Sequence, residues 1–578
     1  MTSHSLIQRL QDFVFYYPFF MSYLWMIGGV VHYFLLEEGR ELSTRTIASS
    51  GIPKVSIVVP CFNEAANARS VIGHLNGMQY PNYDIIAVND GSKDRTGEIL
   101  NELAVEIPRL LVIHHARNEG KAVGLTTAAA VSNAEYLLCI DGDALLAHDA
   151  IGWMLEHFLT DPGVGAVTGN PRIRTRTSLL GRMQVGEFSS IVGLIKRTQQ
   201  VYGRIFTVSG VITMFRKTAL ADVGYWSSDM LTEDIDISWK LQCRDWRVVY
   251  EPHALSWILM PETVKGLYRQ RLRWSKGGIQ VLLKYAGTLM RPTQMMMWPL
   301  FAEYLIGIAW AYSMTFILLL ALIDVVYPLP PNWHVSVVPH WHGMLLVATC
   351  ILQLIIGSMI DRRYDEKLLM YFLDTIWYPV AFWLISMITT VIALPAVVLR
   401  AVASAPFGSV PTEAFNMKNA PIIDLSLRAP RDMIAERGNI VGPVLVAWFR
   451  LVRPALVGGV WASICIYTYR YLLPFNEAEM PIEQIVFYVT SIALIAGTIV
   501  MWLIAGRVVH PLAYRLRVSK MLRRSASVKV RSVPPTAFAS ERRRGARRTT
   551  RILVASHDAN GSISGIEWIA HAEPQPRE

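Results

Sequence analysis

Hydrophobic residues are distributed unevenly along this chain of 578 residues. An aromatic-rich apolar stretch runs from about Phe13 to Leu36, and long apolar runs return in the second half of the chain. An apolar helix of about 20 residues crosses the roughly 30 Å hydrocarbon core of a bilayer, so such runs predict membrane spans. The first run is too long for a signal peptide, and no small-residue cleavage site follows it. The expected spans are residues 13–36, 298–327, 341–360, 368–399, 444–471 and 485–504.

Between the first two spans the pattern changes to that of a soluble α/β domain. Helical patterns cover residues 67–78 and 96–106, and a further helix is expected after Lys121. Strands that alternate with helices predict a mostly parallel sheet. The buried-strand runs between these helices are residues 55–60, 84–88, 110–114 and 136–140.

Polar side chains follow each of these four strands. Open α/β sheets bind their ligands at the carboxyl ends of the strands. We therefore expect the four polar groups to converge in one crevice. In chain order the groups are Asn63 with Glu64, then Asp90, then Lys121, and finally Asp141 with Asp143.

The pair Asp141 and Asp143 predicts a divalent metal site. Residues two apart in an extended segment point the same way. One or two carboxylates together with a substrate diphosphate suit Mg²⁺ or Mn²⁺, and the metal would neutralise charge on a leaving phosphate. The same spacing also arises by chance, but the apolar strand before it favours a metal site.

The other polar groups have a structural explanation beside a functional one. Asp90 would accept hydrogen bonds from a nucleotide base or ribose, or it would only form a turn with the following glycine. Asn63 and Glu64 have the same two explanations. Lys121 would pair with a donor phosphate as a point charge, or it would be a solvated residue at a helix start.

A second group of acids opens an expected helix further along the chain. It consists of Thr232, Glu233 and Asp234. Asp234 is our candidate for the general base that takes a proton from an attacking hydroxyl, with Glu233 beside it. Acids also favour helix N-termini, and Thr232 suits an N-cap, so a purely structural role is the alternative.

The segment Q-R-L-R-W contributes Gln270, Arg273 and Trp274. An arginine fork holds phosphate oxygens, and a tryptophan stacks on a ring. Gln270 would hydrogen-bond nearby. The alternative is a basic interfacial helix that is anchored by its tryptophan.

Two segments, 178–202 and 262–285, mix apolar and basic residues at helical spacing. Such helices lie along a membrane interface with their basic side toward lipid headgroups. For the first segment, an amphipathic helix that packs on the soluble domain is an equal alternative.

Composition narrows the class of protein. Hydrophobic residues make up 52% and charged residues 17%, and the mean hydropathy is +0.31. These values exclude an ordinary soluble protein. The five cysteines are scattered without a C-x-x-C, which argues against a disulfide framework and a zinc site. A reduced, cytoplasmic catalytic part is the simplest interpretation.

Charge and span number disagree about the topology. The net charge of +10 is concentrated near the C-terminus, and basic residues beside spans mark the cytoplasmic side. Charge thus puts both the linker and the tail inside, whereas three alternating spans would put the linker outside. A re-entrant segment 368–399, which contains Pro379, would resolve the conflict. The expected divisions are 1–50 (span and linker), 51–260 (soluble domain), 261–297 (interfacial helices), 298–400 (spans), 401–440 (linker), 441–510 (two spans) and 511–578 (basic tail).

The motifs P-C-F-N-E, N-D-G-S, D-G-D, T-E-D and Q-R-L-R-W occur together in this order. In this combination the chain resembles the processive, inverting family-2 glycosyltransferases, which include the cellulose, chitin, hyaluronan and poly-N-acetylglucosamine synthases. The text between the motifs, such as residues 168–176 and 185–199, is most similar to the bacterial poly-β-1,6-N-acetylglucosamine synthases. More weakly, residues from about 428 onward resemble the two-span accessory subunit of that synthase, so the chain would be a fusion.

The resemblance implies a GT-A fold, an α/β glycosyltransferase domain with a Rossmann-like mixed sheet inserted between transmembrane helices, followed by a further C-terminal helical membrane region. It implies UDP-N-acetylglucosamine as donor, Mg²⁺ or Mn²⁺ as cofactor, and export of a biofilm polysaccharide across the bacterial inner membrane from a cytoplasmic catalytic domain. The carried-over roles are nucleotide contact for Asp90, metal and diphosphate binding for Asp141 and Asp143, base for Asp234, and the donor–acceptor junction for Gln270, Arg273 and Trp274.

Partners also follow from the resemblance. They are the growing polysaccharide, the bilayer, and periplasmic or outer-membrane proteins for export and deacetylation, with no nucleic-acid polymer. Cyclic di-GMP would bind where the two subunits meet, and arginines of the tail would supply phosphate forks. A basic tail on anionic lipid is the alternative.

Other functions remain open at this point. A transferase that adds one sugar to a lipid has no need of Q-x-x-R-W or of several spans. A non-catalytic membrane receptor for a nucleotide has no need of the full carboxylate set. Within the synthases, a chitin-, cellulose- or hyaluronan-like product is the alternative, because linkage depends on the angle of the acceptor hydroxyl.

Overall fold

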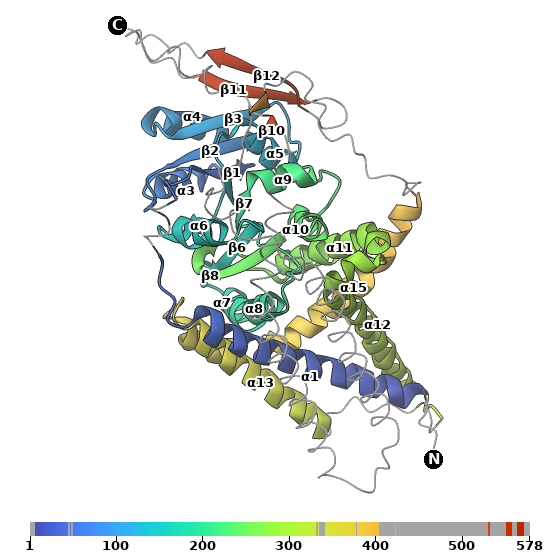
Figure 1. The fold of residues 1–578 in the computed structure, drawn as a ribbon. Helices are drawn as coiled ribbons and strands as arrows, with labels where there is room; N and C mark the ends of the chain where they lie inside the picture. The colour runs from blue at the N-terminus through green and yellow to red at the C-terminus, as the bar shows by residue number, and fades with distance from the viewer. Residues whose placement is uncertain are drawn as a thin grey trace, which may run out of the picture.

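A curved mixed sheet forms the centre of the molecule (Figure 1). The computed structural model of the chain describes residues 6–403 except 44–46, 48–49, 331–332, 334–340 and 377, together with 422–423, 530–531, 551–557 and 563–570. The expected spans 444–471 and 485–504 and nearly all of the expected linker lie outside the described residues.

Ten strands make up this sheet. Their bounds are β1 Val55–Cys61, β2 Tyr83–Asp90, β3 Leu110–His115, β4 Tyr136–Ile140, β5 Leu145–Leu146, β6 Val164–Ile173, β7 Ile212–Arg216, β8 Arg247–Ile258, β11 Arg551–His557 and β12 Ile563–Ala570. They lie in the order β12-β11-β3-β2-β1-β4-β7-β6-β8-β5. Two short segments, β9 Ile422–Ile423 and β10 Val530–Arg531, pair separately.

The four predicted strands are confirmed as the parallel part of the sheet. β1 lies between β2 and β4 and runs parallel to both, with Val55 opposite Tyr83 and Tyr136. β2 and β3 are also parallel, so all four carboxyl ends meet at one edge. β7 runs antiparallel to β4 and β6, which makes the sheet mixed.

Helices cover both faces of the sheet. Successive residues of β1 alternate between two cores, since Ile57 packs with Leu75 and Met154, whereas Val58 packs with Leu125 and Leu220. Burial on both faces explains the continuous apolar runs in the strand sequences. The helices of the domain are α3 Ala68–Leu75, α4 Thr96–Glu106, α5 Lys121–Val131, α6 Ala150–Thr160, α7 Leu179–Glu187, α8 Gly193–Tyr202, α9 Lys217–Val223, α10 Glu233–Cys243 and α11 Val264–Leu289.

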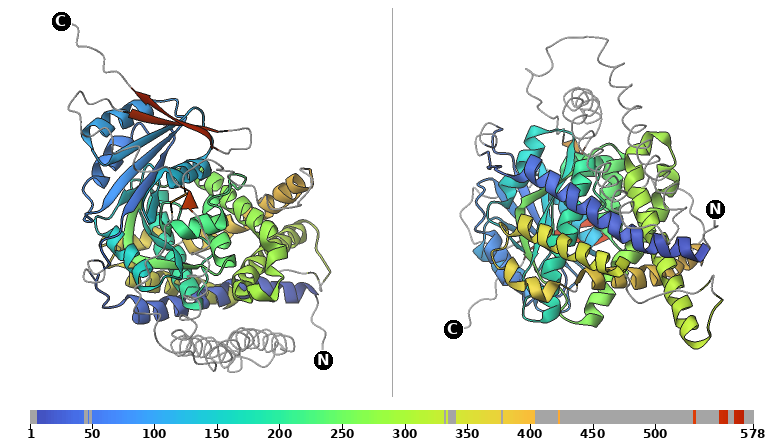
Figure 2. Two further views of the ribbon diagram at one scale, coloured as in Figure 1. Left: turned by 45° about the horizontal axis from the view of Figure 1, so that its top comes forward. Right: turned by 90° about the horizontal axis from the view of Figure 1, so that it is seen from below.

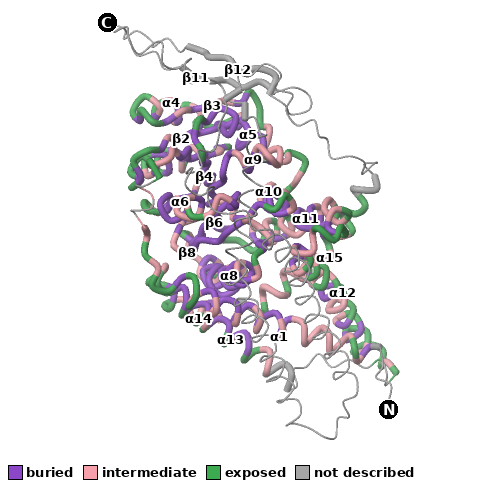
Figure 3. The backbone as a smooth tube through the Cα atoms, in the orientation of Figure 1, coloured by how far each residue is buried: buried purple, intermediate pink, exposed green. Residues whose placement is uncertain are grey.

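Long apolar helices lie below the sheet domain. Their bounds are α1 Leu6–His32 with its π-helical end Tyr33–Glu37, α12 Trp298–Val326, α13 Trp341–Asp361 and α15 Tyr378–Ala403. Three stretches, 7–37, 292–326 and 380–399, are long and apolar enough to cross a membrane. Seen from below, α1 and α13 lie side by side (Figure 2). Figure 3 shows strands such as β2, β4 and β6 buried and much of α12 exposed. Leu322 of α12 is one of the exposed apolar residues.

The expected span 368–399 is shorter in the structure. Its first residues form the 3₁₀ turn Leu368–Tyr371 and the single turn Phe372–Thr375, which pack against α7. Pro379 then lies in the first turn of α15, where a proline costs no helical hydrogen bond. α15 runs from Tyr378 to Ala403 as one helix, so the structure shows no break at Pro379, and the re-entrant segment 368–399 stays a prediction.

Basic residues of α8 and α11 face the protein interior. Lys196, Arg197 and Arg271 are 5%, 0% and 7% exposed. An orientation of these three side chains toward lipid headgroups is therefore wrong, and the alternative of helices packed on the domain holds for α8. The exposed Arg269 and Arg273 leave the rest of α11 compatible with an interface.

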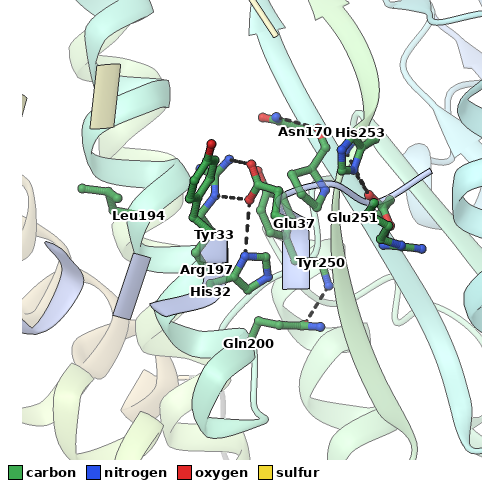
Figure 4. A network of polar contacts seen from close by, with 12 residues as sticks. His32, Tyr33, Glu37, Asn170, Leu194, Arg197, Gln200, Tyr250, Glu251 and His253 are labelled. Carbon is green, nitrogen blue, oxygen red and sulfur yellow. Dashed lines mark hydrogen bonds and ion pairs between the residues drawn. The ribbon is translucent and has the colours of Figure 1, made fainter. Parts of the chain in front are cut away.

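A closed ionic network joins α8 to the membrane-side helices, and Figure 4 shows its Arg197–Glu37 pair. Arg197 contacts both carboxylate oxygens of Glu37, at 2.8 and 3.0 Å, and one of Asp361, at 2.8 Å. Arg172 of β6 pairs with the other Asp361 oxygen at 2.8 Å. All four side chains are at most 3% exposed. Two cations and two anions from α8, β6, the end of α1 and the end of α13 thus balance one another.

The C-terminal tail contributes strands that the basic composition does not predict. β11 runs parallel to β3, with Leu553 opposite Ile113, and β12 completes an antiparallel hairpin with β11. An uncovered edge strand exposes unpaired backbone groups, and the hairpin pairs those of β3. Part of residues 511–578 is therefore an extension of the catalytic sheet.

Candidate active site

A cavity of about 310 Å³ opens at the carboxyl ends of β1 to β4. The predicted convergence of the four polar groups is confirmed, except that Asn63 is not among the lining residues. Gln270, Arg273 and Trp274 do not line this cavity either. Its lining residues are Pro60, Cys61, Phe62, Glu64, Asp90, Asn118, Gly120, Lys121, Asp141, Gly142 and Asp143.

Asp90 ends β2 and is held tightly at the cavity wall. Its carboxylate accepts hydrogen bonds from His115 Nδ1 at 2.8 Å and from the backbone N–H groups of Glu119 and Gly120 at 2.9 Å. Burial alone would raise the pKa of Asp90, but these hydrogen bonds outweigh it and hold the pKa below its ordinary value. His115 ends β3, and nothing in its local sequence marks it as a partner of Asp90.

The β1 loop is tied to the β2 loop by side chains of both. Asn63 has a positive φ of 57°, and its side-chain oxygen accepts from the Lys93 N–H at 2.9 Å. Glu64 lines the cavity and accepts from Asn67 Nδ2 at 2.8 Å. Asn63 thus shapes the loop, whereas Glu64 faces the cavity.

Lys121 lies at the centre of the charges. It begins α5 directly after Gly120, whose φ of +92° favours glycine. Its ammonium contacts Asp141 at 2.5 Å and Glu233 at 3.4 Å. Desolvation would lower the pKa of Lys121, but these acids and Asp234 raise it, so the lysine stays charged.

Asp141 and Asp143 follow β4, and Gly142 between them passes close to β1. A Cβ on Gly142 would lie 3.1 Å from the Pro60 carbonyl oxygen. Burial, then Asp141 and Glu64, raise the pKa of Asp143 to about 6. Among the described residues no three His, Cys, Asp or Glu side chains form a preassembled metal site. The carboxylates of Asp141 and Asp143, together with oxygens of a bound substrate, would still form a ligand set that suits Mg²⁺ or Mn²⁺.

The predicted helix start at Thr232 is confirmed, but its capping bond is not. The Thr232 hydroxyl makes no hydrogen bond with any described residue and lies against α11. A Cβ on Gly277 would be only 2.0 Å from it, so only glycine allows this approach. Asp234 accepts from its neighbour's N–H and has a pKa raised to about 6 by burial and then by Glu233.

Asp236, for which the sequence suggests no role, fixes α10 to α11. It is fully buried and accepts from Ser227 Oγ at 2.7 Å and Tyr285 OH at 3.0 Å. Lys284 lies 2.9 Å from the same carboxylate. The buried Asp236 therefore holds α10, which begins with the acids Glu233 and Asp234, against α11, which carries Q-R-L-R-W.

The Q-R-L-R-W residues lie on α11, which packs against the start of α10 at Thr232. Gln270 contacts Met260, Arg273 is exposed, and the charge of Arg273 lowers the pKa of Asp234. The ring of Trp274 lies 4.2 Å from the guanidinium of Arg271. Arg271 in turn pairs with Glu187 at 2.6 Å, which no spacing signal in the sequence indicates.

The mixed sheet and the acid-rich cleft at its strand ends fit a glycosyltransferase of the GT-A fold, and sequence comparison identifies this class. Residues 53–277 match the family described as Glycosyltransferase like family 2. The chain belongs to glycosyltransferase family 2 and is a polysaccharide synthase of that family.

The curated relatives are more specific. The chain is 36% identical over 396 residues to a poly-beta-1,6-N-acetyl-D-glucosamine synthase of Staphylococcus epidermidis, which covers 67% of this chain and 95% of the relative. The synthase of Staphylococcus aureus strain COL is 34% identical over 395 residues with the same coverage. A solved mannosyltransferase from Pyrobaculum calidifontis, in complex with GDP-Man and Mn²⁺, is 18% identical with a TM-score of 0.48 and covers 67% of this chain and 97% of its own.

Proposed function

We propose that this chain is a membrane-embedded, processive, inverting transferase that polymerises N-acetylglucosamine from UDP-N-acetylglucosamine into poly-β-1,6-N-acetylglucosamine. The observation that carries the proposal is the cavity at four strand ends, which brings the charged groups together next to Asp234. The names of the relatives support the product. The apolar helices support a membrane location and export.

The reaction is a single displacement. Asp234 removes the proton from an acceptor hydroxyl, whose oxygen attacks the anomeric carbon while the bond to the UDP oxygen breaks. The sugar configuration therefore inverts. A carboxylate with a pKa of about 6 is mostly ionised at neutral pH and is a stronger base than an ordinary aspartate. Glu233 sustains this pKa through its negative charge.

The donor is bound at the cavity. Asp90 and Glu64 contact the nucleoside, Asn63 holds the shape of the β1 loop beside it, and Lys121 pairs with the diphosphate. Four acids and one lysine line the cavity among the described residues, so an anionic donor needs a further cation there. Asp141 and Asp143 are the residues that would hold Mg²⁺ or Mn²⁺, which would supply positive charge to the departing diphosphate.

The acceptor lies on the α11 side. Gln270, Arg273 and Trp274 border the junction between donor and acceptor. A tryptophan face suits a sugar ring, and Arg273 is free to contact phosphate oxygens because it is exposed. The spans beside α11 would carry the polymer away, and a chitin-, cellulose- or hyaluronan-like product is the second candidate within the same chemistry.

One experiment tests the proposal. Purified membranes are given labelled UDP-N-acetylglucosamine with Mg²⁺, with and without EDTA, and with and without cyclic di-GMP. We expect high-molecular-weight product that requires the metal and is cleaved by a glycosidase specific for β-1,6 linkages. UDP release with only short or lipid-linked product would replace the synthase by a single-transfer enzyme. The cyclic di-GMP arm examines regulation by residues 428–578.

A further inference from the structure

Helix α8 carries two neighbouring buried cations that face different partners. Arg197 belongs to the closed ionic network with Glu37 and Asp361. Lys196, about 100° away around the helix, donates instead to Ser209 Oγ at 2.5 Å and approaches Thr168 Oγ1 at 3.4 Å. Lys196 forms no ion pair with a carboxylate in the part of the chain that the structure describes. Its partners among the described residues are these two hydroxyl groups and the face of the Tyr250 ring, whose centroid lies 5.7 Å from the ammonium nitrogen.

The turn that Lys196 supports is a wall of the proposed active site. The Ser209 N–H donates to Thr168 Oγ1 at 2.7 Å, and the Gly210 carbonyl accepts from Lys121 at 3.1 Å. A Cβ on Gly210 would lie 3.5 Å from an Asp234 carboxylate oxygen. The turn at Ser209 and Gly210 therefore bonds Lys121, and Gly210 lines the same small pocket as Lys121 and Asp234.

A buried ammonium without a carboxylate partner is costly. Burial lowers the pKa of Lys196 to about 7, and the charge of Asp234 opposes this fall. An apolar side chain of similar length would fill the same space without that penalty. The geometry at Ser209 offers a reason for a lysine, because an ammonium can bind both hydroxyl oxygens below the turn at once.

We propose that Lys196 is a positioning residue of the transfer reaction, which fixes the turn at Ser209 and Gly210 between Lys121 and Asp234. The inference rests on the proposed function and adds to it a residue outside the sequence motifs. Lys196 does not touch the reacting atoms. It acts through Ser209, and loss of its ammonium leaves the turn free to move away from Asp234.

The test compares two buried lysines. Lys196→Met removes the ammonium below the turn. Lys217→Met makes the same change at a lysine that is 1% exposed and bonds the Ser132 carbonyl, away from the cavity. We expect Lys196→Met to lower kcat for UDP release about 10- to 100-fold with less than a twofold change in the Kd for UDP. We expect Lys217→Met to change kcat less than threefold.

A double-mutant cycle with Ser209→Ala tests whether Lys196 acts on the turn through the Ser209 hydroxyl. If Lys196 acts through Ser209, the second substitution costs less than twofold in the Lys196→Met background, although it costs severalfold alone. Equal kcat values for Lys196→Met and Lys217→Met would overturn the inference, and so would fully multiplicative losses in the cycle.

Hydrogen exchange separates this inference from the proposed function, because it needs no activity. Backbone amides of the peptide around Ser209 should exchange at least tenfold faster in full-length Lys196→Met than in wild type, and at the wild-type rate in Lys217→Met. Unchanged exchange in Lys196→Met would overturn the inference even in an active enzyme. A wild type that makes no polymer would overturn the proposed function alone, since the exchange result stands without it.

Discussion

Two groups of buried charge in this protein differ in balance and in access. In the ionic network, Arg172 and Arg197 face Glu37 and Asp361, and none of the four side chains is more than 3% exposed. In the cavity, Lys121 is 29% exposed and meets more acids than it can neutralise.

This difference indicates that the ionic network stabilises the fold, whereas the charges of the cavity serve the reaction. A neutral set of buried ions balances its own charges and needs no charged ligand to do so. An acid-rich, open set is incomplete, and its acids acquire raised pKa values, as Asp143 does in the cavity. Asp234, in the small pocket on the other side of Lys121, also has a raised pKa. Removing a charge from the network should therefore cost folding stability, whereas removing one from the cavity should cost turnover.

The largest expected effect is that of Asp234→Asn. The amide keeps the shape of the side chain but takes no proton, so kcat should fall by about 10³- to 10⁴-fold. The Kd for UDP should stay within twofold, measured by calorimetry on the same preparation. Asp149→Asn is the matched control, because Asp149 lines neither the cavity nor the small pocket that contains Asp234, and it should leave kcat unchanged. Substantial turnover by Asp234→Asn would remove Asp234 as the base.

Arg197→Met tests the other side of the comparison. It leaves Glu37 and Asp361 buried without their shared cation, which typically costs about 3–5 kcal/mol of the free energy of unfolding. Thermal unfolding in detergent, followed by fluorescence, should show a markedly lower midpoint. Arg95→Met breaks an exposed pair with Glu98 and should leave the midpoint where it is. Equal midpoints for both variants would show that the network adds no stability.

The donor side of the site could be predicted from the sequence because its signals are local. A buried strand ends, a polar residue follows, and the topology of a parallel sheet brings the ends together. Strand 136–140 therefore lies where the pattern puts it, and the predicted strand 110–114 is longer by one residue, His115. Asp141 and Lys121 follow those strand ends into the cavity. Local pattern was sufficient here.

The membrane-facing side could not be predicted in the same way. Arg271 and Arg273 lie two residues apart, yet one is buried against Glu187 and the other is exposed. Helical periodicity gives the direction of a side chain around the helix axis, but it does not identify the residue from another element that the side chain contacts. Glu37 and Arg197 are 160 residues apart, and only the packed fold joins them.

The acid limb of the pH profile should identify the base more finely. Below about pH 6 Asp234 gains a proton, so kcat at saturating donor and metal should fall about tenfold per pH unit. Glu233 raises the pKa of Asp234. Glu233→Gln removes that charge, so the pKa of the base falls and the limb should move to lower pH. A limb that stays in place or moves to higher pH would contradict this assignment.

The smallest expected effect concerns the contact between the two motif-bearing helices. A Cβ at Gly277 would meet the Thr232 hydroxyl at 2.0 Å, so Gly277→Ala must push α11 away from the start of α10. We expect kcat to fall about three- to tenfold, because Trp274 and Arg273 on α11 then shift relative to Asp234.

Gly287→Ala is the matched control on the same helix, since nothing lies within 4 Å of a Cβ there. Alanine favours a helix over glycine by roughly 1 kcal/mol, so this variant should be as active as wild type and slightly more stable. Gly277→Ala gains the same helix propensity, which separates the effect of the contact from that of helix stability. If both variants keep wild-type kcat, the spacing between α10 and α11 does not limit transfer, and the comparison rests on the charges alone.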